Sequence, residues 1–342
     1  MGNFLTINNK NKYCLALLIC SVVALFIIAI LFGAVRISFS DIISAVFGGD
    51  VPEYIKDIIV TYRIPRAITA LLCGYILAIC GLQMQTLIKN PLADPYILGV
   101  SSGAGLGVAL FVMGFSVPAI SAISGTLGNL GMVAAAWIGS IAVTLIILSA
   151  SARLKDNLSL LILGVMIGAV ASAIIGLLQY ASSETALKSY ILWSMGSFSA
   201  LSYDQVKIIL LLAVGGTLLS VYNIKDLNVM LLGEGYSKAL GVDVRKVRIR
   251  VLITVTLMAG GITAFCGPIG FVGIAAPHIA RMIFKDANHK ILLPASALCG
   301  TVMMQSADII TQLISKTGAV PINSISALLG IPVIIYIILK KK

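Results

Sequence analysis

The sequence from Lys225 to Arg250, KDLNVMLLGEGYSKALGVDVRKVRIR, is the longest polar interruption in an otherwise apolar chain. Apolar runs border it on both sides, Val206–Val221 before it and Val251–Cys266 after it. Its basic residues outnumber its acids, as is typical of a connection on the cytoplasmic side of a membrane. The segment therefore either forms a compact surface that a soluble partner binds, or is a solvated loop that only orients the protein.

Local signals within this segment predict two short helices, Leu227–Leu232 and Tyr236–Leu240. Gly233-Glu234-Gly235 separates them, and Gly241 follows the second helix as its expected C-cap. A pair of short helices on a basic loop would form a rigid knob at the membrane surface.

The composition indicates that most of the surface faces lipid. The chain has 342 residues, of which 59% are hydrophobic and 11% are charged, whereas a soluble domain carries about 25% charged residues. Its mean hydropathy is +1.05. The net charge of +11 would also suit a nucleic-acid-binding protein, but the basic residues lie in short clusters between apolar runs, which favours orientation in a bilayer. The sequence predicts an all-α integral membrane protein without a nucleic-acid partner.

About ten apolar runs approach the ~20 residues that cross a bilayer. They are Tyr13–Val35, Ala67–Ile88, Ile97–Met113, Leu130–Ala152, Leu158–Tyr180, Val206–Val221, Val251–Cys266, Ile269–Phe284, Leu292–Ile314 and Val320–Leu339. Two further pieces, Pro118–Gly125 and Ala186–Leu201, are too short or too polar to cross and are predicted to be re-entrant or interfacial.

The distribution of Lys and Arg orients the chain. With the N-terminus inside, the cytoplasmic connections hold Lys10, Lys12, Lys89, Arg153, Lys155, Lys225, Lys238, Arg245, Lys246, Arg248, Arg250, Arg281, Lys285, Lys290, Lys340, Lys341 and Lys342. The outside connections hold Arg36, Lys56, Arg63, Arg66, Lys188 and Lys316, with Lys207 at a boundary. Residues 1–342 are therefore expected to form a single transmembrane domain with both termini in the cytoplasm and cytoplasmic helices at about 225–245.

No catalytic constellation is present in the sequence. The chain has 2 histidines, His278 and His289, and lacks H-E-x-x-H, G-x-S-x-G and the P-loop pattern G-x-x-x-x-G-K-[ST]. Its 6 cysteines lie in or beside apolar runs without metal-ligand spacing, so no metal site is expected. Uphill transport by such a chain would draw its energy from a partner or from an ion gradient.

Asp308 is the clear acid at membrane depth, in the sequence Gln305-Ser-Ala-Asp308-Ile-Ile. An intramembrane acid is a functional hypothesis by default, and an ion-coupled secondary transporter working through Asp308 is the alternative from another class. A single carboxylate without a partner makes a poor proton relay, so structural hydrogen bonding within the bundle is the competing interpretation.

The most distinctive apolar stretch runs from Gly267 to Arg281 and reads GPIGFVGIAAPHIAR. Its prolines and glycines break the helix and expose backbone groups, which neighbouring groups or a water-filled path must satisfy. His278 and Arg281 lie three residues apart on one helix face. They form either an interfacial structural pair or a ligand site.

Several short motifs occur in a fixed order along the chain. They are Arg63-Ile-Pro-Arg66, Gly81-x-x-Met84-Gln85, Asn90-Pro-Leu-Ala-x-Pro95, Leu98-Gly-Val-Ser-x-Gly103, Leu192-x-x-Met-Gly196-Ser-Phe, Gly267-x-Ile-Gly-Phe-Val-Gly273-x-x-x-Pro-His278-x-x-Arg281 and Ala307-Asp308. From about Arg36 to Leu339, the chain resembles permease subunits of the iron-chelate (siderophore and haem) and vitamin B12 family of ABC importers.

This resemblance implies a type II ABC importer permease fold with ten transmembrane helices in the bacterial plasma (inner) membrane. It also implies a homodimer with a translocation path on its two-fold axis, two ABC ATPase subunits on the cytoplasmic side and a substrate-binding protein on the other side. The chain would then be a transport subunit rather than an enzyme and bind no cofactor itself, with ATP and Mg used by the partner ATPase. The expected cargo is a ferric siderophore or haem, with cobalamin as the nearest alternative.

The resemblance also implies roles for individual residues. The expected ATPase contacts are Leu232, Gly233, Glu234, Ala239, Leu240 and Gly241. The expected binding-protein contacts are Arg63 and Arg66, with Lys316 replacing a basic residue that the family often carries where Gln312 stands here. The cytoplasmic gate is expected at Asn90, Leu92, Asn157 and Ser159. Positions expected to shape the packing or the pathway are Gly267, Pro268, Gly270, Gly273, Pro277, His278, Arg281 and Asp308.

Overall fold

The computed structural model describes residues 9–33, 35, 37–49, 51–114, 126–151, 157–199, 201–314 and 320–340. Among these residues every regular element is helical. In chain order they are α1 (Asn9–Leu31), α2 (Phe39–Phe47), α3 (Glu53–Asp57), the π-helical turn η1 (Ile58–Arg63), α4 (Ile64–Ile88), α5 (Val100–Ala109), η2 (Leu110–Gly114), α7 (Thr126–Ser151), α8 (Asn157–Ala181), α9 (Glu184–Ser194), α10 (Tyr203–Met230), α11 (Glu234–Ala239), α12 (Val244–Val255), η3 (Thr256–Gly260), α13 (Gly261–Cys266), α14 (Val272–Phe284), α15 (His289–Ile314) and α16 (Ile322–Lys340).

The helices confirm the predicted all-α membrane fold. In the described part of the chain, 7 helical stretches are long and apolar enough to cross a membrane: Asn9–Leu31, Glu53–Ile88, Leu130–Ser151, Ser159–Ala181, Tyr203–Met230, Val244–Cys266 and His289–Ile314. Three shorter apolar stretches, Val100–Gly114, Val272–Phe284 and Ile322–Ile337, fall on the remaining predicted runs. Ten complete crossings therefore stay a prediction.

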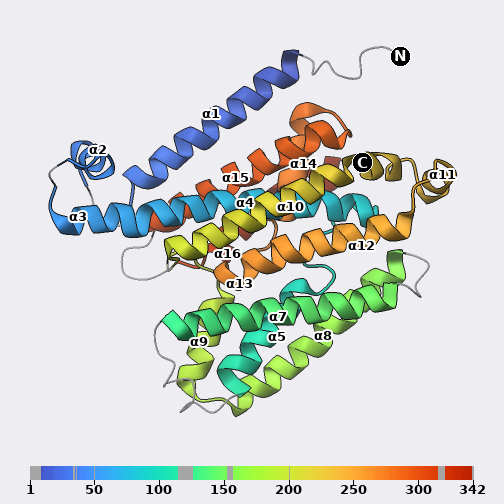
Figure 1. Cartoon of the computed structure of the whole chain (residues 1–342), viewed down its shortest axis with the longest axis horizontal. Coiled ribbons are helices and arrows are strands. Elements are labelled where there is room, and N and C mark those ends of the chain that lie inside the picture. Colours follow the sequence, from blue (N-terminus) through green and yellow to red (C-terminus); the bar gives the residue numbers. More distant parts are fainter. Residues whose placement is uncertain are drawn as a thin grey trace.

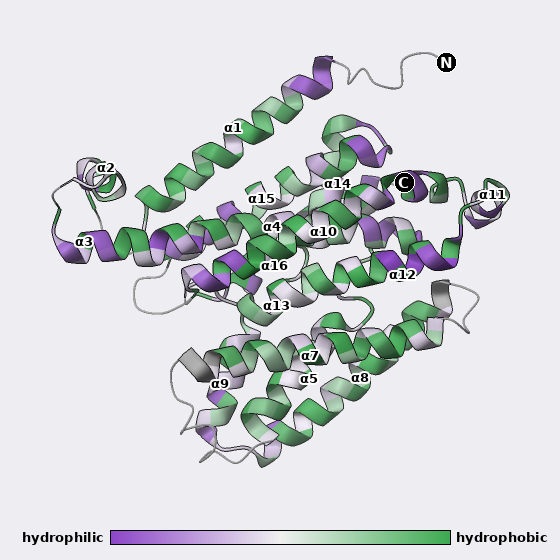
Figure 2. Ribbon diagram, viewed as in Figure 1, coloured by the Kyte–Doolittle hydropathy of each residue, from purple (hydrophilic) through white to green (hydrophobic). Residues whose placement is uncertain are grey.

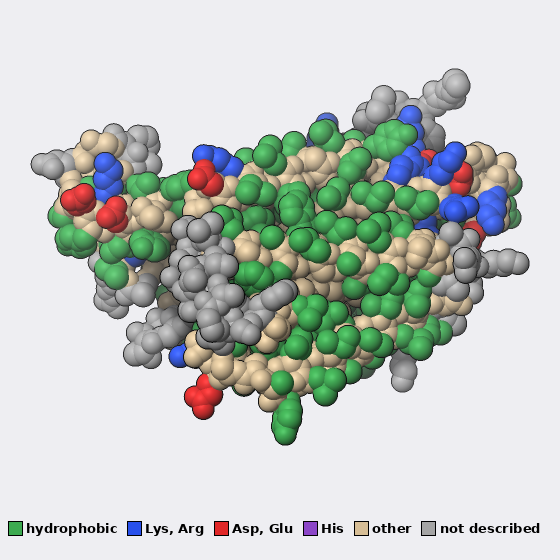
Figure 3. All heavy atoms as spheres, turned by 60° about the horizontal axis from the view of Figure 1, so that its bottom comes forward, with side chains coloured by type: hydrophobic (Ala, Val, Ile, Leu, Met, Phe, Trp, Pro, Cys, Tyr) green, Lys and Arg blue, Asp and Glu red, His purple; other side chains and the backbone are tan. Residues whose placement is uncertain are grey.

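The bundle has two polar ends and an apolar middle. Figure 2 shows hydrophobic ribbon through the centre of the bundle and hydrophilic residues gathered toward α3 on one side and α11 on the other. We call these the α3 end and the α11 end. In Figure 1, α1 begins, and the chain reaches its C-terminus, on the side of the bundle nearer to α11 than to α3. In Figure 3, Lys and Arg side chains gather at the same end.

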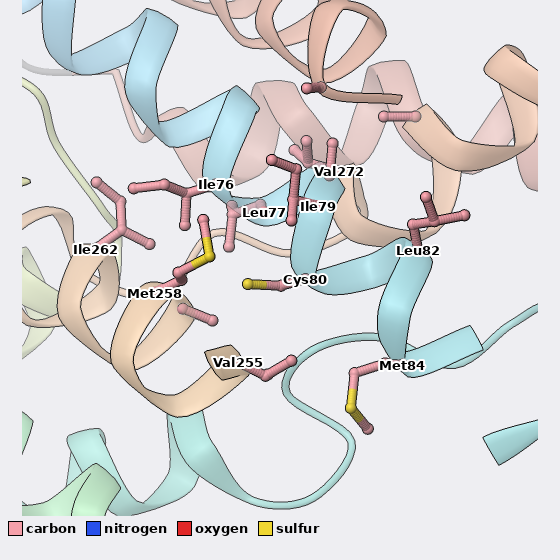
Figure 4. Close-up of a cluster of buried hydrophobic side chains, with 14 of the residues drawn as sticks. Ile76, Leu77, Ile79, Cys80, Leu82, Met84, Val255, Met258, Ile262 and Val272 are labelled. Carbon is pink, nitrogen blue, oxygen red and sulfur yellow. The ribbon is translucent and has the colours of Figure 1, made fainter. Parts of the chain in front are cut away.

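Helix α4 is the most enclosed long element. Its glycines allow its backbone to touch the backbones of neighbouring helices. A Cβ atom on Gly74 would lie 2.1 Å from the carbonyl oxygen of Gly300 in α15, and one on Gly81 would lie 1.9 Å from that of Gly273 in α14. Such contacts bring helices close where no hydrophobic force acts between them. Figure 4 shows Ile76, Leu77 and Cys80 of α4 packed with Met258 and Ile262 of the η3–α13 segment.

Within the polar segment from Lys225 to Arg250, the part that lies outside the long helices α10 and α12 is shorter than the sequence suggested. The prediction of a separate helix at Leu227–Leu232 was wrong, because α10 continues to Met230. Leu227 and Met230, three residues apart on one helix face, are 0% and 1% exposed, so the buried face of α10 extends past the membrane run. Helix α12 also begins early, at Val244, after Asp243 accepts the Lys246 N–H as N-cap.

The two segments predicted to be re-entrant or interfacial have different outcomes. Ala186–Leu201 contains most of α9, an 11-residue helix that begins after the N-cap Ser183 and is too short to span. Pro118–Gly125 lies outside the described residues.

Candidate functional site

A compact knob, residues Leu231–Val242, closes the connection between α10 and α12 at the α11 end. Gly241 has φ +82°, a conformation that favours glycine. Its N–H donates to Lys238 O (3.0 Å), and the Val242 N–H donates to Ser237 O (2.9 Å). This is the Schellman arrangement, so the predicted C-cap at Gly241 is confirmed. The Ser237 side chain, which is 0% exposed, lies 2.7 Å from Gly233 O and fixes the start of α11.

The outer surface of the knob combines apolar and basic side chains. Leu232, Tyr236 and Leu240 are 62%, 72% and 62% exposed. Lys238 and Arg245 are exposed beside them in the chain. The segment lies beyond Met230, where the part of α10 that is long and apolar enough to cross a membrane ends. Exposed aromatic and aliphatic groups with a polar rim are typical of a protein-binding surface.

Ion pairs at the base of the knob use some of the predicted basic residues internally. Arg248, with a side chain 7% exposed, lies 3.9 Å from Glu234 of α11. Arg250 pairs with Asp226 of α10, and its guanidinium lies 5.0 Å from the centre of the Tyr222 ring. These contacts hold α10, α11 and α12 together. The Lys246 N–H bonded to the Asp243 carboxylate lowers the pKa of Asp243 and favours the charged cap.

The connection at residues 89–99, which we call the turn, carries two of the predicted gate residues. The Leu92 N–H donates to Asn90 Oδ1 (2.9 Å), and the Tyr96 N–H donates to Asp94 Oδ1 (2.9 Å). Such Asx turns give a short loop a fixed shape. Burial raises the pKa of the Asp94 carboxyl to about 6, although the Tyr96 N–H opposes the shift. Leu92 remains 38% exposed.

The other two predicted gate residues lie on the first turn of α8. This helix begins at Asn157, whose side chain lies outside the described residues, and Ser159 is partly buried. Helix α8 packs against the turn, since a Cβ atom on Gly164 would lie 2.7 Å from Ile97 O. The contact joins Gly164 to Ile97, so the meeting of Asn157 and Ser159 with Asn90 and Leu92 in one gate stays a prediction.

His278 and Arg281 bind different partners on neighbouring elements. His278 Nε2 donates to Pro91 O in the turn (2.8 Å). Arg281 donates to Gln85 Oε1 in α4 (2.6 Å). Both residues attach α14 to its neighbours, which supports the structural interpretation.

The broken backbone before α14 finds its partners in α16. Gly267 has φ +75°, and Gly270 N–H donates to Asn323 Oδ1 (3.0 Å) while Gly270 O accepts from Ser326 Oγ (3.3 Å). Helix α16 therefore satisfies the backbone groups that Gly270 leaves outside a helix. Pro277 lies inside α14.

At the α3 end, Asp308 is paired rather than alone. Its Oδ1 accepts Arg66 Nε (2.8 Å), and its Oδ2 accepts Gln312 Nε2 (2.7 Å). The Asp308 side chain is 0% exposed and that of Arg66 25%. The assumption that Asp308 lacks a partner was wrong, and its structural hydrogen bonding is confirmed. A partner 242 residues away in sequence left no local signal.

Arg63 occupies a different environment from Arg66. It is 6% exposed, and its guanidinium donates to the carbonyl oxygens of Ile30 (2.7 Å), Leu31 (3.1 Å) and Val35. It therefore ties the end of α1 to the start of α4. Docking by Arg63 stays a prediction that this burial does not favour, and Lys316 lies outside the described residues.

Known proteins resemble this chain in both sequence and fold. The model of the FecCD transport family matches residues 20–340. The chain is 36% identical over 282 residues to the hemin transport system permease protein HmuU of Yersinia pestis, covering 82% of each chain. It is 33% identical over 279 residues to the vitamin B12 import system permease protein BtuC of Vibrio cholerae, covering 81% of each.

A solved structure, described as an inward-facing conformation of a metal-chelate type ABC transporter, matches with a TM-score of 0.83 and 27% identity. The match covers 96% of this chain and 99% of that chain. The family model and the solved structure thus both match almost the full length of this chain. The chain belongs to the FecCD transport family and is a multi-pass membrane permease of the ABC importer type.

Proposed function

We propose that this chain carries an iron complex, a ferric siderophore or haem, into the cytoplasm, and that the knob is the surface through which a separate ATPase drives it. The observation that carries the proposal is the group Leu232, Tyr236 and Leu240, exposed on and beside the short helix α11 outside the apolar spans. Tyrosine and large aliphatic groups are the kind of side chains that anchor protein interfaces.

The distribution of charge supports a cytoplasmic position for the knob. Most described Lys and Arg residues belong to the α11 end, among them Lys89, Lys238, Arg245, Lys285 and Lys290. Cytoplasmic loops carry this excess. In this orientation the turn is the cytoplasmic gate, and the α3 end faces the substrate-binding protein.

A second copy of the chain is the expected neighbour of α8. Ala169, Ala173 and Gly176 are exposed along this helix, and a Cβ atom on Gly176 would meet no atom within 4 Å. A glycine in a helix costs about 1 kcal/mol relative to alanine, and none of the described residues fills the space that Gly176 leaves. Small residues on a lipid-facing helix favour close packing with another helix. We place the translocation path between two copies that meet here.

Docking of the binding protein belongs, in this proposal, to the α3 end. Arg66 is the better candidate of the two predicted arginines, because a quarter of its side chain is exposed, whereas Arg63 is enclosed by α1. Arg66 would act with its charge partly offset by Asp308.

Relatives named for hemin and for vitamin B12 support an iron complex and cobalamin as competing cargoes. The ion-coupled alternative has less support, because Arg66 and Gln312 occupy the carboxylate of Asp308 that a relay would need.

Reconstituted vesicles would test the proposal. The permease, its cognate ATPase and its cognate binding protein are assembled in proteoliposomes, and uptake of ⁵⁵Fe-siderophore, haem and cobalamin is followed separately. We expect uptake of an iron complex only when ATP and all three components are present. Accumulation by the permease alone under a proton or sodium gradient would overturn the ATPase assignment, and uptake of cobalamin alone would overturn the cargo.

A further inference from the structure

The last turn of α10, immediately before the knob, is joined to the first turn of α15. Asn228 Oδ1 accepts both the backbone N–H of His289 (2.9 Å) and its ring Nδ1–H (2.8 Å). Asn228 Nδ2 donates to Asn288 Oδ1 (2.8 Å), and Asn288 O accepts the Ile291 N–H (3.0 Å) as α15 begins. The base of the knob is thus attached to the start of α15 through side chain and backbone together.

The His289 ring continues this connection to α4. It is 1% exposed, and its Nε2 lies 2.8 Å from Thr86 Oγ1. Because Asn228 Oδ1 can only accept, Nδ1 carries a hydrogen, and Nε2 of the neutral ring is left as an acceptor. The single hydrogen of the Thr86 hydroxyl is shared between this nitrogen and Leu82 O of its own helix (3.1 Å). Both ring nitrogens are therefore engaged, which fixes the orientation of the ring.

Thr86 lies where α4 gives way to the turn. It is 5% exposed and three residues before Lys89, which closes α4 with φ +56°. The turn that follows carries Asn90 and Leu92. The hydrogen-bonded connection Asn228–His289–Thr86 therefore runs from the base of the knob to the base of the turn.

We infer that this hydrogen-bonded connection transmits displacement of the knob to the turn, and that His289 is its positioning residue. The inference rests on the proposed function of the knob. Asn228 is partly buried, whereas Thr86 and His289 are 5% and 1% exposed. Hydrogen bonds between buried groups are directional and costly to leave unmade. Movement of α10 must therefore carry the ends of α15 and α4 with it. A second buried link, from Gln83 Nε2 of α4 to Ser220 Oγ of α10 (2.9 Å), holds the same two helices together one turn further along.

The test removes one hydroxyl at a time. Thr86→Val deletes the link to His289, and Thr86→Ser keeps it. Thr144→Val is the matched control, because Thr144 is 6% exposed and its hydroxyl lies 2.8 Å from that of Thr256, outside the hydrogen bonds that join Asn228, His289 and Thr86. Each variant is purified with the cognate ATPase, and we measure ATPase retention, melting temperature and the stimulation of phosphate release by the cognate binding protein.

We expect all three variants to retain the ATPase and to melt near the wild type. Stimulation should fall about five-fold or more in Thr86→Val, the lower range of typical coupling between sites, and persist in Thr86→Ser and Thr144→Val. Asn228→Leu should give the same loss, and the double variant with Thr86→Val should be no worse than either single change. Equal stimulation in Thr86→Val and Thr144→Val would overturn the inference. Failure of the wild-type permease to retain any ATPase would instead overturn the proposed function.

Discussion

Replacing Arg66 by Gln should destabilise the fold strongly, because it leaves the buried carboxylate of Asp308 without its cationic partner. Arg66 Nε lies 2.8 Å from Asp308 Oδ1, and the Asp308 side chain is 0% exposed. Two unit charges about 4 Å apart interact with about 4 kcal/mol at an effective dielectric constant of 20. Removing one member of a buried pair costs about 3–5 kcal/mol because it leaves a buried charge uncompensated, and replacing both members removes that charge as well.

The double variant Arg66→Gln/Asp308→Asn should therefore recover most of the stability that Arg66→Gln loses. Thermal unfolding in detergent can be followed with a thiol-reactive dye, because Cys73, Cys80 and Cys266 are buried in the native protein. Lys207→Gln is the control, since Lys207 forms a 2.9 Å ion pair with Asp204 at the same end between side chains that are 72% and 86% exposed. An exposed pair of this kind contributes little.

Two results would refute this reasoning. If Arg66→Gln melted like Lys207→Gln, the pair would not stabilise the bundle. If the double variant lost the sum of the two single losses, Arg66 and Asp308 would not act as a pair. Weaker binding-protein association without a change in melting temperature would assign Arg66 to docking alone.

Three further changes test other parts of the molecule. Gly74→Ala would place a Cβ 2.1 Å from a backbone oxygen of α15, so the helices must separate and stability should fall by about 1–3 kcal/mol. Gly215→Ala meets no atom within 4 Å and should raise the melting temperature slightly; the reverse order would contradict the packing argument. Tyr236→Asp should weaken ATPase binding by about 2 kcal/mol or more in a titration. Tyr62→Asp at the α3 end is the silent control, because Tyr62 is 61% exposed against 72% for Tyr236. The pKa of Asp94 rises from 3.8 to about 6 on folding, so the native state binds this proton more tightly and the stability it contributes is lost as pH rises through that range. Asp94→Asn should remove that part of the pH dependence of melting, and an unchanged profile would exclude Asp94 as its source.

Hydropathy predicted the helices well because the bilayer imposes a length on every crossing. The predicted run Ala67–Ile88 and the observed α4 end at the same residue. The boundaries at the α11 end were less predictable. Leu227 and Met230 continue the buried face of α10 beyond the lipid, so a polar sequence there does not mean a loop.

The contacts at the candidate sites were beyond the reach of sequence alone. Arg66 and Asp308 are each visible as charges near or within apolar runs, but their pairing depends on α4 lying beside α15. Similarly, Thr86 and Asn228 are ordinary polar residues until His289 is found between them. The two arginines of the motif Arg63-Ile-Pro-Arg66 look equivalent in the sequence. In the fold, Arg63 is buried against α1 and Arg66 is paired with Asp308.

The placement of polar contacts along α4 bears on how motion could pass through the molecule. Arg66 binds α15 at the α3 end, Thr86 binds α15 at the α11 end, and between them Gly74 and Gly81 touch neighbouring backbones. A helix held at both ends and packed backbone to backbone in its middle cannot bend locally without losing several contacts at once. It is therefore expected to move as one body with α15. Because α4 carries the turn at one end and Arg66 at the other, a push on the knob that reaches Thr86 through His289 would change both openings of the path together. Flexible coupling, in which each opening responds separately, would require a break within α4, and the π-helical turn η1 lies before that helix rather than within it.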